Sequence, residues 1–126
     1  MKNLLLISLL AFLGCSKPQK EIVGIWQPKS KFYSATYQLE LQNNLLIGKV
    51  IYYDDGTTRY KQTGTVKDVF LKNITYENEE FVDSFSGATT SNSAISFKQI
   101  HKDTLKVSTK ILNSVLIEFW IRKKTN

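Results

Sequence analysis

Few side chains in this sequence could carry out chemistry. It contains one histidine, His101, and one cysteine, Cys15. A zinc site needs several ligands drawn mainly from these two residue types, and an activated nucleophile needs a base within hydrogen-bond reach. His101 stands in a predicted turn beside Lys102 and Asp103, where a single histidine is typically exposed to solvent. The sequence therefore predicts no metal site and no histidine-based or thiol-based catalysis.

The carboxylates offer two further arrangements, and both are incomplete. Asp54-Asp55-Gly56 begins like a calcium-binding loop, but it lacks the alternating carboxylates, and Thr65 stands where such a loop needs its bidentate glutamate. Asp83 and Glu118 are of the types that glycosidases use as a pair, but nothing in the sequence brings them together. We therefore expect the chain not to be an enzyme and to hold neither a metal nor a cofactor.

The N-terminus has the pattern of an exported protein. Residues 4–13 form an apolar run that is typical of a signal peptide and too short to cross the ~30 Å hydrocarbon core as a helix. The run ends in Gly14-Cys15, which resembles the lipobox of bacterial lipoproteins, although Phe12 stands where leucine is usual. That resemblance implies cleavage before Cys15 and attachment of fatty acids such as palmitate to it. Residues 1–14 are thus predicted to be the signal peptide, and residues 15–21 the lipidated cysteine and a polar tether.

Lipidation would place the protein in the bacterial cell envelope, with the membrane as a partner through the N-terminal lipid. Ser16, the second residue of the mature chain, is compatible with sorting to the outer membrane. Because Cys15 is the only cysteine, its modification leaves no thiol for a disulfide, even in an oxidising compartment. The domain must therefore be stabilised by its core.

Charge excludes one class of partner. Lys and Arg number 17 against 11 Asp and Glu, which gives a formal net charge of +6. The lysines are spread along the chain, as is typical of solvated strand faces, and they form no dense basic stripe. We therefore expect no nucleic-acid partner.

The segment 22–124 has the pattern of strands and turns. In residues 36–42, Tyr37, Leu39 and Leu41 alternate with polar residues, and residues 105–111 alternate in the same way, which indicates half-buried antiparallel strands. Further strands are expected at 22–26, 46–53, 58–62, 69–77, 81–86, 94–100 and 115–122. Strands at this hairpin spacing predict an all-β domain, an antiparallel up-and-down barrel of about eight strands, with a two-sheet sandwich as the alternative.

The two ends of this domain carry a recognisable pairing. The sequence has Gly24-Ile25-Trp26 on its first predicted strand and Arg122 on its last. It resembles lipocalin-like (calycin) barrels, in which an arginine from the end of the barrel packs on the Trp of a Gly-x-Trp motif. The resemblance implies that Gly24, Trp26 and Arg122 close one end, with the guanidinium stacked over the indole. The wider order of segments is similar to an uncharacterised family of small exported bacterial proteins, and this implies a fold rather than an activity.

A barrel of this size either fills with side chains or holds one small ligand. The residues expected to face inward and contact a ligand are Tyr37, Leu39, Tyr52, Phe97 and Phe119, with Leu41 and Ile121 beside them. Bulky residues on short strands leave little volume, so we expect a small cavity for an apolar or amphipathic ligand.

The alternative is a protein-interaction or inhibitor module that acts through loops such as 84–93 and holds no internal ligand. Ser86-Gly87 in that loop is similar to the Ser-Gly-x-x-Tyr motif of small lipoprotein lysozyme inhibitors, with Thr90 in place of the tyrosine. The sequence identifies no protein partner.

Cys15→Ser tests the N-terminal prediction. The substitution removes the acylated thiol, so the protein should leave the membrane fraction or become mislocalised while its β domain stays folded. Cell fractionation measures the release from the membrane, and circular dichroism measures whether the β domain is folded. A purified mature protein that begins at another residue and carries no lipid would contradict the prediction.

Overall fold

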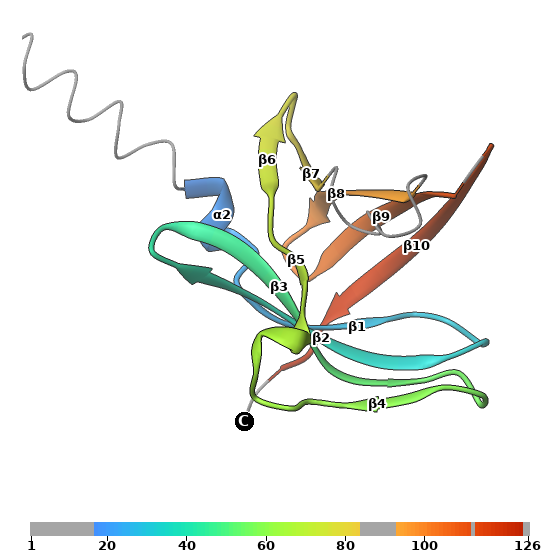
Figure 1. The fold of residues 1–126 in the computed structure, drawn as a ribbon. Coiled ribbons are helices and arrows are strands. Elements are labelled where there is room, and N and C mark those ends of the chain that lie inside the picture. Colours follow the sequence, from blue (N-terminus) through green and yellow to red (C-terminus); the bar gives the residue numbers. More distant parts are fainter. Residues whose placement is uncertain (1–16, 84–92, 112, 125–126) are drawn as a thin grey trace, which may run out of the picture.

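The computed structural model describes residues 17–83, 93–111 and 113–124 (Figure 1). The predicted signal peptide, Cys15 and most of the loop 84–93 lie outside the described residues. Within the described part, no helix has the length and apolar character needed to cross a membrane.

The structure confirms the all-β prediction. In the described residues, a short helix and a 3-10 helix accompany ten strands, and every strand pairing is antiparallel. The elements are α2 (Lys17–Glu21), β1 (Gly24–Pro28), β2 (Ser34–Gln42), β3 (Leu45–Asp54), β4 (Arg59–Lys61), η1 (Val66–Asp68), β5 (Val69–Leu71), β6 (Ile74–Glu77), β7 (Glu80–Asp83), β8 (Ser93–His101), β9 (Thr104–Ile111) and β10 (Ser114–Arg122).

The strands follow the order β4-β3-β2-β1-β10-β9-β8-β7-β6, so the first strand of the chain lies beside the last. Trp26 of β1 is opposite Arg122 of β10 in this pairing. The sheet curls into a half-barrel rather than a fully hydrogen-bonded closed barrel, because β4 and β6 stand at the two ends of the path. Figure 1 shows β10 and β1 diverging away from the point where they pair.

The single strand expected at 69–77 is divided in two. Its first part, β5, pairs with β3, and its second part, β6, pairs with β7. Between them the backbone N–H of Lys72 donates to the buried carboxylate of Asp83 at 3.0 Å. A side chain thus takes the place of a ladder bond where the strand changes partner, and this division turns the nine expected segments into the ten strands of the described residues.

Hairpin turns follow the local sequence. Asn43 and Asn44 join β2 to β3 with φ values of 52° and 67°. Two successive residues with positive φ form the hairpin turn whose twist matches the flanking strands, and asparagine tolerates this backbone region well. The turn between β6 and β7 has the same form at Asn78 and Glu79.

A bulge decides which side chains of β3 face the core. Tyr37 is opposite Val50, but the preceding residue Thr36 is opposite Tyr52, so one extra residue is inserted in β3. Because successive strand residues point to opposite faces, the insertion turns Tyr52 outward and brings Tyr53 against the core. The expected inward orientation is therefore wrong for Tyr52.

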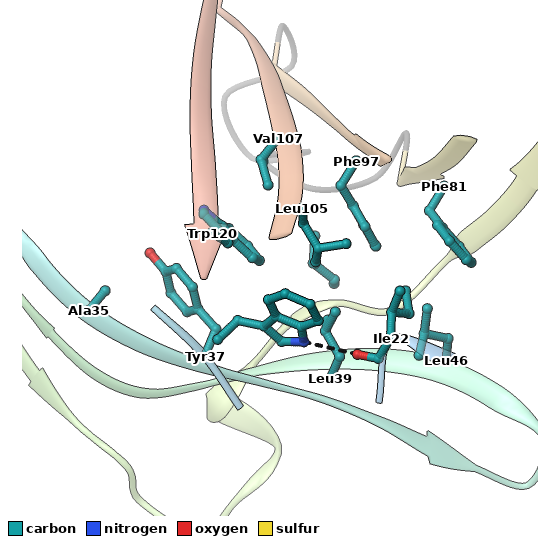
Figure 2. Close-up of a cluster of buried hydrophobic side chains, with 12 residues drawn as sticks. Ile22, Ala35, Tyr37, Leu39, Leu46, Phe81, Phe97, Leu105, Val107 and Trp120 are labelled. Atoms are coloured by element: carbon teal, nitrogen blue, oxygen red, sulfur yellow. Dashed lines mark hydrogen bonds between the residues drawn. The ribbon is translucent and has the colours of Figure 1, made fainter. Parts of the chain in front are cut away.

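The core is a cluster of buried side chains that the curled sheet encloses (Figure 2), and Trp26 is a fully buried member of it. The Trp26 Nε1–H donates to the carbonyl of Ile22 at 2.9 Å, which satisfies the buried indole. The Phe81 and Phe97 rings stack with centroids 5.2 Å apart. The other buried members include Ala35, Tyr37, Leu39, Leu46, Leu71, Leu105, Val107 and Trp120.

Asp68 organises the loop between β4 and β5. Its Oδ1 accepts from the Tyr60 hydroxyl at 2.6 Å and from Thr63 N at 2.8 Å, and its Oδ2 accepts from Gly64 N at 2.8 Å. The hydrogen bond from Tyr60, followed by those from Thr63 and Gly64, holds the pKa of this carboxyl well below its usual range. The loop is therefore closed around a carboxylate that accepts bonds from three residues.

Asp68→Asn should lower the melting temperature by several degrees, because the new amide directs N–H groups at donors. A depressed pKa in the folded state stabilises the fold above the unfolded pKa of about 4, and this contribution is lost as pH falls toward the folded value. The difference in melting temperature between the wild type and the variant should therefore become smaller as the pH falls. Thermal melts from pH 7 to pH 2 measure it, with exposed Glu77→Gln as control. A gap independent of pH would contradict this role.

Candidate functional site

The interior is packed at one end of β10 and open at the other. The inward-facing residues along this strand are Trp120, Glu118 and Leu116. Trp120 is 3% exposed, Glu118 is half-buried, and Leu116 is 53% exposed. Burial thus decreases steadily away from Trp26. We call the inner-face positions around Glu118 the open end.

Polar and aromatic groups from three other segments meet Glu118 there. The hydroxyl of Tyr33, between β1 and β2, donates to both carboxylate oxygens at 2.8 and 2.7 Å. The Tyr33 ring lies 5.4 Å from the ring of Tyr53 on β3. Tyr37 of β2 packs on Trp120 with a centroid distance of 4.7 Å, and its hydroxyl points away from Ile22 (Figure 2). We name Tyr33, Tyr37, Tyr53, Glu118 and Trp120 the open-end cluster.

The phenols of this cluster hold their protons strongly. Burial, followed by the hydrogen bond to Glu118, raises the pKa of Tyr33 far above its usual value. Burial, followed by the negative charge of Glu118, raises the pKa of Tyr37 to about 12. Both hydroxyls therefore act as hydrogen-bonding groups rather than as bases or nucleophiles at physiological pH. This chemistry suits binding better than proton abstraction.

The Trp120 indole has an unsatisfied donor. Its Nε1 is buried and has no hydrogen-bond partner among the residues that the structure describes. Leaving a buried donor unpaired costs about 1–3 kcal/mol, so native structures rarely contain one without a reason. Trp120 belongs to the same inner face as Glu118, two residues along β10. A ligand or water that reached the open end could accept this hydrogen bond.

The residues predicted to contact a ligand are only partly brought together. Tyr37, Leu39 and Phe97 all lie in the core, and Tyr37 alone belongs to the open-end cluster. Phe119 is 41% exposed and lies on the opposite face of β10 from Trp120, as does Ile121. The expected inward orientation is thus wrong for Phe119 and Ile121 as well as for Tyr52.

Sequence reasoning overlooked the roles of Tyr33 and Tyr53. Tyr33 lies outside any strand, and Tyr53 reaches the interior only because of the bulge in β3. Glu118 had a usable signal, because it is the single acidic residue in an apolar strand and alternates in phase with Trp120. Its suggested carboxylate partner Asp83 lies on β7, which two strands separate from β10 in the sheet, and it accepts a backbone bond there.

The opposite end is closed by Gly24, Trp26 and Arg122, which the structure brings together. The Arg122 Cζ lies 4.4 Å from the Trp26 ring centroid. Its guanidinium donates to the carbonyls of Glu21 at 2.6 Å and Val23 at 2.8 Å. A Cβ added to Gly24 would lie 2.6 Å from Arg122 Nη1, and the φ of Gly24 is +148°. Only glycine therefore fits beneath the guanidinium.

The other polar candidates are engaged in local structure. Asp54 accepts from Gly56 N at 2.9 Å, and Asp55 accepts from Thr57 N at 2.9 Å, so these carboxylates hold their own turn. His101 is exposed and accepts from Asp103 N through Nδ1 at 3.3 Å. Across the described ranges, no group of three or more His, Cys, Asp or Glu is arranged to hold a metal ion.

Comparison with known proteins gives no match. No family model, no curated protein and no solved structure is similar to this chain. The open-end cluster is therefore interpreted from its own geometry.

Gly24→Ala should lower the free energy of unfolding, because the methyl group displaces Arg122 from Trp26. Arg122→Lys should lower it by about 1–3 kcal/mol, since an ammonium cannot stack and form the same fork of hydrogen bonds. The losses in free energy of unfolding from the two changes should be less than additive, because lysine at position 122 has no guanidinium for the new methyl group to clash with. Urea unfolding measures all three variants.

Gly56→Ala is the matched control for backbone strain, because its φ is +89° and an added Cβ would have no neighbour within 4 Å. Gly56→Ala should lower the free energy of unfolding by the same amount in the wild-type and the Arg122→Lys backgrounds. Full additivity of Gly24→Ala with Arg122→Lys would contradict the close fit.

Proposed function

We propose that this chain is a lipid-anchored protein of the bacterial envelope whose lipocalin-like half-barrel binds a small amphipathic ligand at its open end. The observation that carries this proposal is the buried, unpaired Nε1–H of Trp120, in phase with Glu118 on one inner face. The pairing of the first and last strands through Trp26 and Arg122 supports the lipocalin-like assignment.

The cluster favours a particular kind of polar group. Trp120 offers a donor, whereas Glu118 offers acceptors. A hydroxyl or a neutral amide can satisfy both, because it accepts and donates at once. A carboxylate would be repelled by Glu118. The apolar part of the ligand would contact Leu116, which is 53% exposed on the inner face, and the half-buried ring of Tyr53.

The ligand would sit beside the core rather than within it. Leu39, Phe97 and Leu105 are fully or almost fully buried in the core cluster. A bound molecule therefore cannot contact these side chains at the packed end. Binding therefore needs only the inner surface that extends beyond Trp120. This location explains how a domain with a filled core can still bind a small molecule.

Probe binding tests the proposal. Every core residue lies between Ile22 and Trp120, so a chain that lacks residues 1–15 keeps the whole core and can be used in solution. It should bind the neutral probe N-phenyl-1-naphthylamine, and dodecanol should displace the probe more effectively than dodecanoate. Glu118→Gln should abolish that preference for the alcohol. Fluorescence titration measures each step.

Trp120→Phe should weaken dodecanol binding about 2-fold to 10-fold, the loss expected for one hydrogen bond. It should destabilise the fold less than Trp26→Phe does, because both changes remove the same buried ring but only Trp26 loses a satisfied hydrogen bond. Trp26→Phe is the matched control, since its indole N–H is already bonded to Ile22 and its loss should affect stability without affecting binding. Equal binding by wild type, Trp120→Phe and Glu118→Gln would contradict the site.

A further inference from the structure

The outer face of β10 carries an apolar stripe that the open-end cluster does not use. Val115, Ile117, Phe119 and Ile121 point outward and are 60%, 50%, 41% and 40% exposed. The outward face of a half-buried antiparallel sheet is normally polar, and contiguous exposed apolar groups mark contact surfaces. At about 3.3 Å per residue the stripe is roughly 20 Å long, and it follows a single strand.

Lysines flank this stripe on both sides. On β9, Lys110 is opposite Val115 and Lys106 is opposite Phe119. Lys98 of β8 is in turn opposite Lys106. On the other side, the backbone N–H of Lys29 donates to the carbonyl of Phe119 at 2.8 Å. All four lysines are exposed.

One acidic residue, Glu80 at the start of β7, lies at the margin of this surface, where it lines a groove together with Lys110 and Val115. Among the described outward positions of β8, β9 and β10, the residues other than the stripe and the lysines include no Asp or Glu: they are Ala94, Ser96, His101, Thr104 and Ser108. Glu118 of β10 faces inward, to Tyr33. With four exposed lysines against Glu80, the face is apolar along β10 and net positive at its margins.

We propose that this outer face lies against an anionic membrane surface. An apolar row with basic residues at its margins is the arrangement that binds the boundary between headgroups and acyl chains, where Lys contributes by attraction to anionic lipid. A second copy of the chain meeting the same face would bring Lys106 and Lys110 against like charges. A neutral apolar partner would leave these lysines without counter-charge.

The contact differs from the predicted lipid anchor in what it determines. A lipid on Cys15 tethers one point of the chain, whereas contact along β10 sets the orientation of the whole domain. The inner face of the same strand carries Glu118 and Trp120, so the open end would face away from the stripe and stay accessible while the outer face touches lipid.

Fluorescent labelling of the full chain in vesicles tests the orientation. In a Cys15→Ser background, a nitrobenzoxadiazole label is placed on Ile117→Cys, or on Gln38→Cys as a control on the outer face of β2. In vesicles of phosphatidylcholine with 30% phosphatidylglycerol, we expect the label at position 117 to shift to the blue and to be quenched by doxyl lipids, while the label at position 38 is unaffected. Equal responses at both positions would overturn the proposal.

Vesicle sedimentation tests the role of charge. For the chain lacking residues 1–15, replacing Lys106 and Lys110 by glutamine should weaken binding to the same vesicles roughly 25-fold, at about fivefold per lysine. Replacing exposed Lys61 and Lys72 instead should change it little. Equal losses from both pairs would overturn the proposal, as would a blue shift at position 117 without vesicles that grows with protein concentration, which would indicate a second copy.

Discussion

The contact between Arg122 and Trp26 is the interaction on which the rest of this structure depends. It joins the last strand to the first, and the guanidinium at the same time satisfies carbonyls in the segment that leads into β1. Pairing β1 with β10 brings the two halves of the meander together, so that residues from β2 and β9 share one core. Because this closure is made at one end only, the strands diverge beyond it, and the open end follows directly from where the closure is placed.

Buried polar groups fall into two kinds. Asp68 and Asp83 accept backbone N–H groups and hold a loop and a strand division in place. The indole N–H of Trp26 likewise donates a hydrogen bond, to the carbonyl of Ile22. The Trp120 indole is different because nothing in the described structure accepts its hydrogen bond, and it lies next to the least buried part of the interior. A satisfied polar group stabilises the fold, whereas an unsatisfied one needs a separate explanation, which the proposed ligand supplies for Trp120.

Strand β10 carries the evidence for both proposals, on opposite faces. Its inward residues form part of the open-end cluster, and its outward residues form the apolar stripe. The strand carries apolar residues on both sides, which is unusual for a strand with one solvated face, and the two proposals give each side a partner. An envelope protein held against a bilayer by the outer face would present its ligand site to the opposite side of the same strand. A molecule released from the membrane could then reach the cluster without crossing the domain.

The sequence by itself determined the class of fold, because alternation and turn residues act over a few neighbours. The period of two in 36–42 and the Asn43-Asn44 turn both appear as expected, and Gly24, Trp26 and Arg122 mark the strands that meet. Only the tertiary structure decided which face of a strand is inward. One inserted residue in β3 exchanges Tyr52 for Tyr53, and in a strand as apolar as β10 the alternation does not distinguish Phe119 from Trp120. The direction in which a side chain points depends on the register between strands that are distant in sequence, and the local sequence pattern does not determine that register.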